Sequence, residues 1–151
     1  MERAIELSRK NLGRPDDGGP FGAVIVKSGQ IVGEGYNSVL RLKDPTCHAE
    51  VMAIRDACQN LGTHDLSDCE IYTSCEPCPM CLSAIYWSRM GTIYFGNSRK
   101  DAERIGFDDD FIYQQIPIDP LARKIPSYQC LKEEAGTIFD EWSRIENKMM
   151  Y

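Results

Sequence analysis

The hydrophobic positions early in the chain form one pattern typical of an amphipathic helix and two short runs typical of strands. The continuous apolar run Ala23–Val26 predicts a buried strand, and Gln30–Tyr36 predicts a second one. Ser28-Gly29 between them is a turn sequence, so the two strands are expected to form a hairpin. Upstream, Glu2–Leu12 predicts a short amphipathic helix. Its expected apolar side is formed by Ala4, Ile5, Ser8 and Leu12.

The middle of the chain repeats helix and strand patterns. Cys47–Leu61 predicts the first long helix, and Gly62 supplies its C-terminal cap. The expected apolar stripe of that helix is Val51, Ile54, Cys58 and Leu61. The pattern then predicts a strand, a helix, a strand and a brief helix, at Glu70–Thr73, Cys78–Ser88, Thr92–Phe95 and Asp101–Ile105. This order predicts an α/β layered domain with a mixed sheet and both long helices starting on one side of it.

The pattern becomes irregular beyond Gly106. Three acids lie between aromatic residues in Phe107–Tyr113, and three prolines punctuate residues 117–126. A last helix is predicted from about Thr137 to Lys148. Its apolar stripe is Phe139, Trp142, Ile145 and Met149. No linker composition divides the chain, so residues 1–151 are expected to form one domain.

Two short motifs carry the chemistry. His48-Ala49-Glu50 and, one helix and one strand later, Pro77-Cys78-Pro79-Met80-Cys81 reproduce H-x-E followed by P-C-x-x-C, the pattern of zinc-dependent nucleobase deaminases. His48, Cys78 and Cys81 are predicted to hold Zn²⁺, because a catalytic zinc takes three protein ligands and leaves a fourth position open to water. Glu50 is predicted to move the protons of the reaction.

The spacing of these residues is explained by helix starts. Pro79 suits the first position of a helix, which places Cys78 at the cap and Cys81 in the first turn. His48 and Glu50 are only two residues apart, so they converge on one metal only at a helix start. A closed structural zinc site with Cys75 as fourth ligand is the alternative interpretation, but such a site has no use for Glu50.

Composition indicates which classes of partner and which cellular location to expect. The chain has 151 residues and a net charge of −6 at pH 7, with no dense Lys/Arg cluster, so nucleic acid is disfavoured as a substrate. No apolar run is long enough to span a membrane. The Met1–Ala4 start lacks the apolar core of a signal peptide, which predicts a reducing cytoplasmic location with free thiols. Four further cysteines are expected to be small core residues: Cys47, Cys58, Cys69 and Cys130.

The chain resembles the cytidine-deaminase superfamily over nearly its whole length, and within it the small guanine deaminases. The stretches that carry the resemblance are Gly18–Val26, Asp44-Pro45-Thr46 with His48-Ala49-Glu50, Tyr72–Cys81, Gly106-Phe107-Asp108-Asp109 and the tail ending in Tyr151. The zinc motif is common to the superfamily, whereas the acidic segment and the terminal tyrosine are typical of the guanine enzymes.

The resemblance implies both a fold and a reaction. It implies a three-layer sandwich with a five-stranded mixed sheet between helices. It also implies that the segment from about residue 107 to 151 is exchanged between the subunits of a domain-swapped homodimer. In such an enzyme Asn37 reads the purine edge, Asp109 accepts hydrogen bonds from guanine, and Tyr151 of the partner closes the pocket. The implied reaction is hydrolysis of guanine to xanthine and ammonia in purine metabolism.

Other deaminases remain as alternatives, acting on guanosine, cytosine, an aminated triazine or tRNA adenosine. A zinc-binding module without catalysis is a further alternative, against which Glu50 argues.

Overall fold

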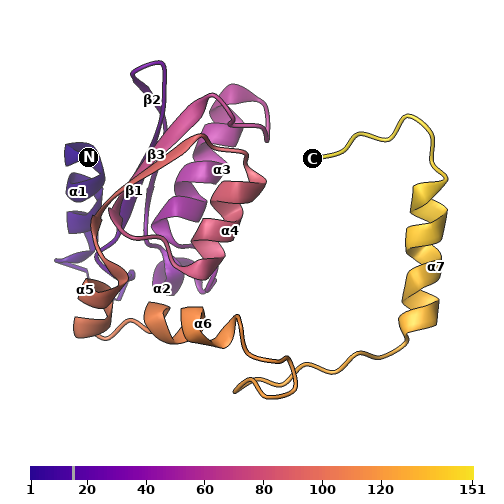
Figure 1. The fold of residues 1–151 in the computed structure, drawn as a ribbon. Coiled ribbons are helices and arrows are strands. Elements are labelled where there is room, and N and C mark those ends of the chain that lie inside the picture. The colour runs from indigo at the N-terminus through magenta and orange to yellow at the C-terminus, as the bar shows by residue number, and fades with distance from the viewer. Residues whose placement is uncertain (15) are drawn as a thin grey trace. The chain divides into compact units, whose positions relative to one another are not determined.

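A mixed β-sheet organises the first part of the chain (Figure 1). The computed structural model describes residues 1–14 and 16–151. Among these the sheet has four strands in the order β2-β1-β3-β4. Their bounds are Gly22–Lys27 for β1, Gln30–Tyr36 for β2, Cys69–Cys75 for β3 and Thr92–Asn97 for β4. Strand β1 is antiparallel to β2 and β3, and β3 is parallel to β4, so the predicted hairpin and mixed sheet are confirmed.

The five-stranded sheet implied by the family resemblance is wrong for the described residues, because the sheet has four strands. The hydrophobic pattern itself predicted only these four. After β4 the chain enters helices α5 (Arg99–Arg104) and α6 (Asp109–Gln115). Prolines at 117, 120 and 126 follow. Proline lacks the N–H that a strand donates to its neighbour, so this stretch is a poor strand former.

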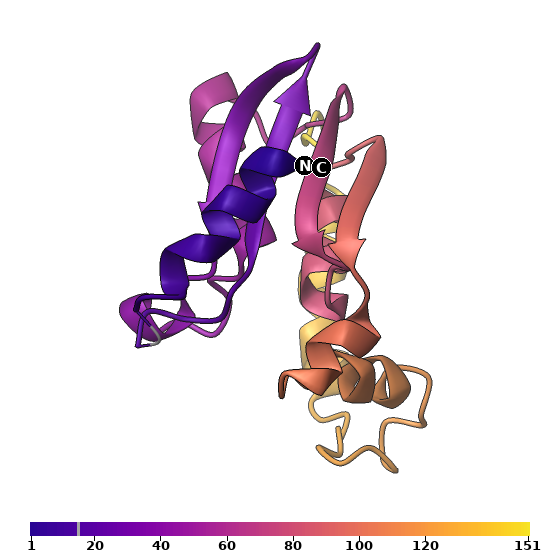
Figure 2. The same ribbon diagram turned by 90° about the vertical axis from the view of Figure 1, so that its left-hand side faces the viewer.

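Helices cover both faces of the sheet (Figures 1 and 2). Alternate residues of β1 point to opposite faces. Ala23 and Ile25 belong to the buried cluster formed with α3 (Ala49–Leu61) and α4 (Pro79–Trp87), whereas Val24 packs with α1 (Glu2–Ser8). Both long helices therefore start on one side of the sheet, as predicted.

Helix α3 lies very close to strand β2. A side chain at Gly33 or Gly35 would place its Cβ 2.5 Å or 2.1 Å from a backbone oxygen of α3, so only glycine fits there. The fully buried face of α3 is accordingly formed by small residues, Ala49, Ala53 and Ala57. The predicted stripe lies at the margin of this contact, where Ile54, Cys58 and Leu61 are partly buried.

The apolar face predicted for the first helix is partly wrong. Ala4 is buried as expected, but Ile5 and Leu12 are exposed and Leu7 is buried instead. Helix α1 ends at Ser8 and a 3-10 turn over Arg9–Asn11 follows, so Leu12 lies beyond the α-helix whose periodicity placed it on this face.

Residues Gln114–Tyr151 form a separate compact unit. It contains helix α7 (Lys132–Ser143), which begins and ends five residues earlier than predicted. The four residues of its predicted apolar stripe are 48 to 82% exposed in the single chain. Cys130 is exposed, so its assignment to the core is wrong for the single chain, whereas Cys47 and Cys69 are buried.

A short helix, α2 (Val39–Leu42), was not predicted. None of the helices in the described part of the chain has the length and apolarity needed to cross a membrane.

Candidate active site

Two helix starts bring the predicted metal ligands together. His48 is the residue before α3 and Cys78 the residue before α4, and both have extended backbone. Pro79 is the first residue of α4, so Cys81 lies in the first turn of that helix, as the spacing predicted. Because α3 and α4 lie on the same face of the sheet, ligands 30 residues apart in sequence meet in space.

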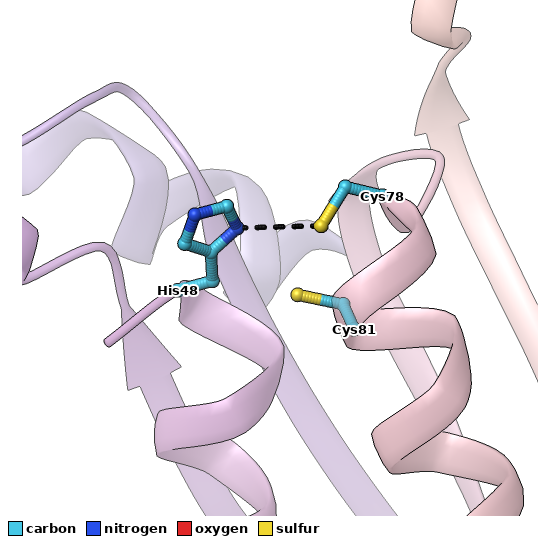
Figure 3. Close-up of side chains that lie close together, drawn as sticks. All are labelled: His48, Cys78 and Cys81. Atoms are coloured by element: carbon cyan, nitrogen blue, oxygen red, sulfur yellow. Dashed lines mark hydrogen bonds between the residues drawn. The ribbon is translucent and has the colours of Figure 1, made fainter. Parts of the chain in front are cut away.

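The three side chains lie close enough together to bind one metal ion. One ligand atom from each of His48, Cys78 and Cys81 lies within 4.8 Å of the others (Figure 3). His48 Nδ1 is 3.6 Å from Cys78 Sγ. Zinc bound at about 2.0 Å to nitrogen and about 2.3 Å to sulfur holds those two atoms roughly 3.5 Å apart. The donor set therefore fits Zn²⁺.

The electrostatics of the site favour a thiolate. The pKa of Cys78 is lowered to about 4, because Cys81 donates a hydrogen bond to it and His48 does so as well. The same hydrogen bond, together with burial, raises the pKa of Cys81. The pKa of His48 is raised chiefly by its hydrogen bond to Cys78. A metal replaces the protons that these groups share.

Cys75 is not part of this group among the described residues. Burial raises the pKa of its thiol to about 12, and its Sγ lies 3.6 Å from the carbonyl oxygen of Ser98. The geometry thus favours three protein ligands over a closed four-ligand site.

Glu50 is a buried carboxyl in the first turn of α3, with only 6% of the residue exposed. Thr73 Oγ1 donates to Glu50 Oε1 at 3.4 Å from strand β3. Burial raises the pKa of Glu50 to about 7 in the metal-free chain. Such a group gains and loses a proton near neutral pH, which suits general acid–base chemistry.

Two of the predicted metal ligands, His48 and Cys78, line a pocket that also holds two predicted base-binding residues. Asn37, from the end of β2, and Asp109, from the start of α6, both line it. Burial raises the pKa of Asp109, and the neighbouring Cys78 thiolate adds to this effect. The full lining is Phe21, Asn37, His48, Glu50, Cys75, Glu76, Cys78, Phe107 and Asp109.

Backbone contacts fix the orientation of Asn37. Its backbone N–H donates to the Phe21 carbonyl at 3.0 Å, and its side-chain Oδ1 accepts from Val39 N at 3.3 Å. Gly18 has a φ of +150°, and a Cβ there would lie 2.3 Å from Asn37 Oδ1. With Oδ1 used in this way, the amide NH₂ is the part of Asn37 that can donate to a ligand.

Tyr151 belongs to the unit Gln114–Tyr151 and is 72% exposed there. Its role at the pocket stays a prediction.

Sequence reasoning missed three residues of the pocket wall. Phe21 and Phe107 meet edge to face, with ring centroids 4.7 Å apart and an interplanar angle of 82°. Glu76 lies between Cys75 and the predicted metal ligand Cys78. All three are outside helices and strands, where periodicity carries no information about burial. The glycine-rich loop Gly18–Gly22 is a local signal that could have placed Phe21 beside the pocket.

Comparisons with known proteins agree with this geometry. Residues 1–97 match the family described as cytidine and deoxycytidylate deaminase zinc-binding region. The guanine deaminase of Bacillus subtilis (strain 168) is 48% identical over 151 residues, covering 100% of this chain and 96% of that protein. A tRNA-specific adenosine deaminase of Aquifex aeolicus (strain VF5) is 50% identical over 76 residues, 50% of each protein.

Solved structures show the same relationship. The X-ray structure of the Bacillus subtilis guanine deaminase has a TM-score of 0.93 at 49% identity, covering 99% of this chain and 95% of that one. A guanine deaminase from Nitrosomonas europaea has a TM-score of 0.67 at 38% identity, over 72% of this chain and 63% of that one.

Proposed function

The chain belongs to the zinc-binding family of cytidine and deoxycytidylate deaminases, and from this we propose that it is a zinc-dependent guanine deaminase. It hydrolyses guanine to xanthine and ammonia. The observation that carries the choice of base is the extent of similarity. The guanine deaminase matches the whole chain, including the acidic segment and the tail, whereas the tRNA-specific deaminase matches half of it.

His48, Cys78 and Cys81 would hold the zinc ion. When bound, zinc supplies a Lewis acid that makes water nucleophilic near neutral pH. Glu50 accepts one proton from the attacking water and delivers it to a ring nitrogen of guanine, and it then transfers the proton of the newly added hydroxyl group to the departing amine. The raised pKa of its carboxyl suits both steps. Water thus replaces the amino group, and ammonia leaves.

Two residues are proposed to select the base. The Asn37 amide NH₂ donates a hydrogen bond to an acceptor on the purine edge. The Asp109 carboxylate accepts hydrogen bonds from N–H donors of guanine that adenine lacks. Phe21 and Phe107 form the apolar part of the wall against which a planar base can lie.

The direct test is ammonia release by the purified, zinc-loaded protein from a panel of guanine, guanosine, adenine and cytosine. We expect guanine to be the best substrate, and the Glu50→Gln variant to serve as the inactive control. A preference for adenine or cytosine would contradict the choice of base, while no ammonia from any member would favour a non-catalytic zinc module.

We further propose a homodimer in which the C-terminal segment is exchanged between subunits. The support is the exposure of the apolar stripe of α7 and its C-terminal end: Phe139 is 79% exposed, Trp142 48%, Ile145 50% and Met149 82%. Leaving such side chains in water sacrifices roughly 1.5–3 kcal/mol each. Prolines upstream suit a hinge for exchange between protomers. Burial on a partner would bring Tyr151 to the partner's pocket.

Mixed refolding tests the exchange. A Glu50→Gln chain and a chain lacking Met149–Tyr151 are each expected to have little activity. Refolded together they should regain some, because one site of the mixed dimer has both an intact Glu50 and an intact tail. A fully active monomer would rule out the exchange. We place the enzyme in the cytoplasm and in purine salvage or catabolism, where the thiols of its metal ligands stay reduced.

A further inference from the structure

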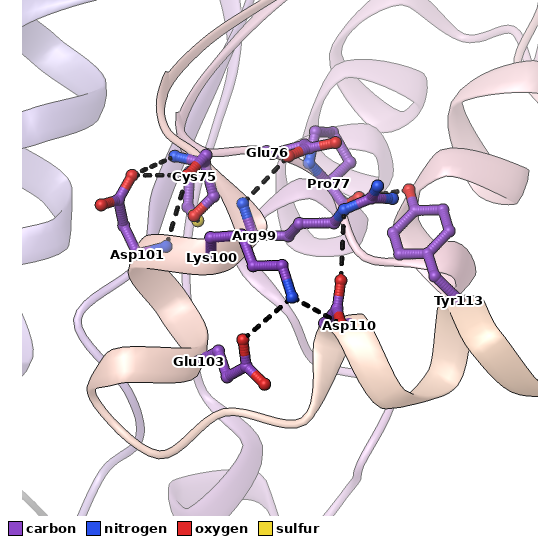
Figure 4. A network of polar contacts seen from close by, with 10 residues as sticks. Cys75, Glu76, Pro77, Arg99, Lys100, Asp101, Glu103, Asp110 and Tyr113 are labelled. Carbon is purple, nitrogen blue, oxygen red and sulfur yellow. Dashed lines mark hydrogen bonds and ion pairs between the residues drawn. The ribbon is translucent and has the colours of Figure 1, made fainter.

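A ring of polar contacts joins three segments beside the pocket (Figure 4). The segments are the cysteine loop between β3 and α4, the start of α5, and the first turns of α6. We call this ring the α5–α6 clamp. Its members are Glu76, Pro77, Arg99, Lys100, Asp110 and Tyr113.

Arg99 is the centre of the clamp. Its backbone N–H donates to Glu76 Oε2 at 2.9 Å, which ties α5 to the cysteine loop. Its guanidinium Nε lies 3.5 Å from Asp110 Oδ1, and its guanidinium carbon lies 4.6 Å from the centre of the Tyr113 ring. The Tyr113 hydroxyl then donates to the Pro77 carbonyl at 2.9 Å, back on the cysteine loop. The ring of contacts is therefore closed.

Asp110 is the charged residue of the clamp that is buried. Only 9% of its side chain is exposed, whereas Lys100 and Arg99 are 63% and 39% exposed. Lys100 Nζ approaches Asp110 Oδ2 at 2.8 Å, so the carboxylate faces two cations. A buried carboxylate is costly unless it is paired, so a shift of α6 away from α5 is strongly disfavoured.

Asp109 is the residue next to Asp110 and lies in the pocket. Glu76 lines the same pocket and precedes the metal ligand Cys78 by two residues. The clamp thus links the loop that carries the proposed metal ligand Cys78 to the turn that carries the proposed base-recognition carboxylate. The contacts on α6 leave little freedom to the backbone of Asp109.

We propose that Asp110 and Tyr113 are positioning residues, which set the place of Asp109 relative to the cysteine loop and thereby the affinity for guanine. This inference rests on the proposed function. Neither side chain is among the residues that line the pocket, so both act through Asp109.

Two conservative variants test the proposal. Asp110→Asn keeps the volume but removes the charge that faces Arg99 and Lys100. Tyr113→Phe keeps the ring beside Arg99 and removes only the hydroxyl that donates to Pro77. The matched control is Glu103→Gln, which removes the exposed second partner of Lys100 and leaves the clamp intact.

The main readout is the equilibrium Kd for guanine, measured by calorimetry on zinc-loaded protein in a Glu50→Gln background where turnover is slow. We expect Asp110→Asn and Tyr113→Phe each to raise Kd about ten-fold, since a misplaced Asp109 loses much of its charge-assisted hydrogen bonding. The control should stay within about two-fold. Zinc should remain near one ion per chain, and kcat in the otherwise native enzyme should change little.

A double-mutant cycle shows whether the effect passes through Asp109. In an Asp109→Asn background, Asp110→Asn and Tyr113→Phe should raise Kd no further. An additive rise overturns the inference, and so does an unchanged Kd in both single variants. Loss of zinc or of kcat at constant Kd would show a merely structural role and also overturn it. A wild-type protein that neither binds nor deaminates guanine overturns the proposed function itself, and this inference with it.

Discussion

Replacing Glu50 by glutamine separates the proton chemistry of the site from its metal binding. The amide has nearly the same size and still accepts the hydrogen bond from Thr73 Oγ1. It cannot take a proton from water. We expect activity on guanine to fall on the order of 10²-fold or more, equivalent to about 3 kcal/mol or more of lost transition-state stabilisation. Zinc should remain near one ion per chain, because three other residues are proposed to hold it.

The same substitution, which lowers activity, should raise the free energy of unfolding of the metal-free protein. Burial raises the pKa of Glu50 from 4.5 to about 7, so the folded chain holds a proton that the unfolded chain releases between these pH values. The free energy of unfolding therefore falls as pH rises through this window. Above pH 7 the full effect is about 3 kcal/mol, and below pH 4.5 it vanishes. Glu50→Gln should thus stabilise the metal-free protein by about 3 kcal/mol at pH 8 and hardly at all at pH 4.5.

Three measurements check this reasoning: ammonia release, zinc content, and denaturant unfolding of the metal-free proteins at several pH values. Zinc lost in step with activity would identify Glu50 as a ligand. Activity that survives the substitution would refute its role in proton transfer. A stability gain that does not depend on pH would show that burial of the charge is not its cause.

Further predictions concern the metal, the base and the fold. Cys75→Ser should retain zinc and Cys78→Ser should lose it in elemental analysis; a metal-free Cys75→Ser protein would support the four-ligand site. Asp109→Ala should lower kcat/KM for guanine by at least about 10²-fold, because the donors of guanine lose the carboxylate that accepts their hydrogen bonds. Unchanged discrimination between guanine and adenine would count against this role of Asp109. Gly35→Ala should destabilise the protein by about 1–3 kcal/mol in thermal unfolding, because its Cβ would lie 2.1 Å from a backbone oxygen of α3. Gly13→Ala, with nothing within 4 Å, is the control, and equal stability of the two variants would contradict the packing argument.

Each of the two motifs of the metal centre was predictable because its own geometry is local. Pro79 after Cys78 specifies a helix start, and the x-x spacing to Cys81 puts the second thiol in the first turn. The two-residue spacing of His48 and Glu50 requires another helix start, which the structure has at Ala49. Each of these features depends on the backbone of a few consecutive residues, so the sequence alone reveals them.

The packing partners were harder to predict, because they depend on contacts between distant segments. The stripe predicted on α3 consisted of larger side chains. The fully buried positions of α3 are instead the alanines that contact the glycines of β2. Those small residues carry little hydrophobic signal on their own. The family resemblance also implied a fifth strand that the described residues do not contain.

The types and spacings of four residues were therefore sufficient to predict the chemistry of the site: His48, Glu50, Cys78 and Cys81. Tertiary structure decided the rest of the site. Only the packing of α3 and α4 on one sheet face brings the two motifs together, and only the contacts of α6 with the cysteine loop bring Asp109 into the same pocket. Helix starts arise from neighbouring residues, whereas a pocket forms where segments distant in the chain meet. Local sequence patterns specify the former and do not encode the latter.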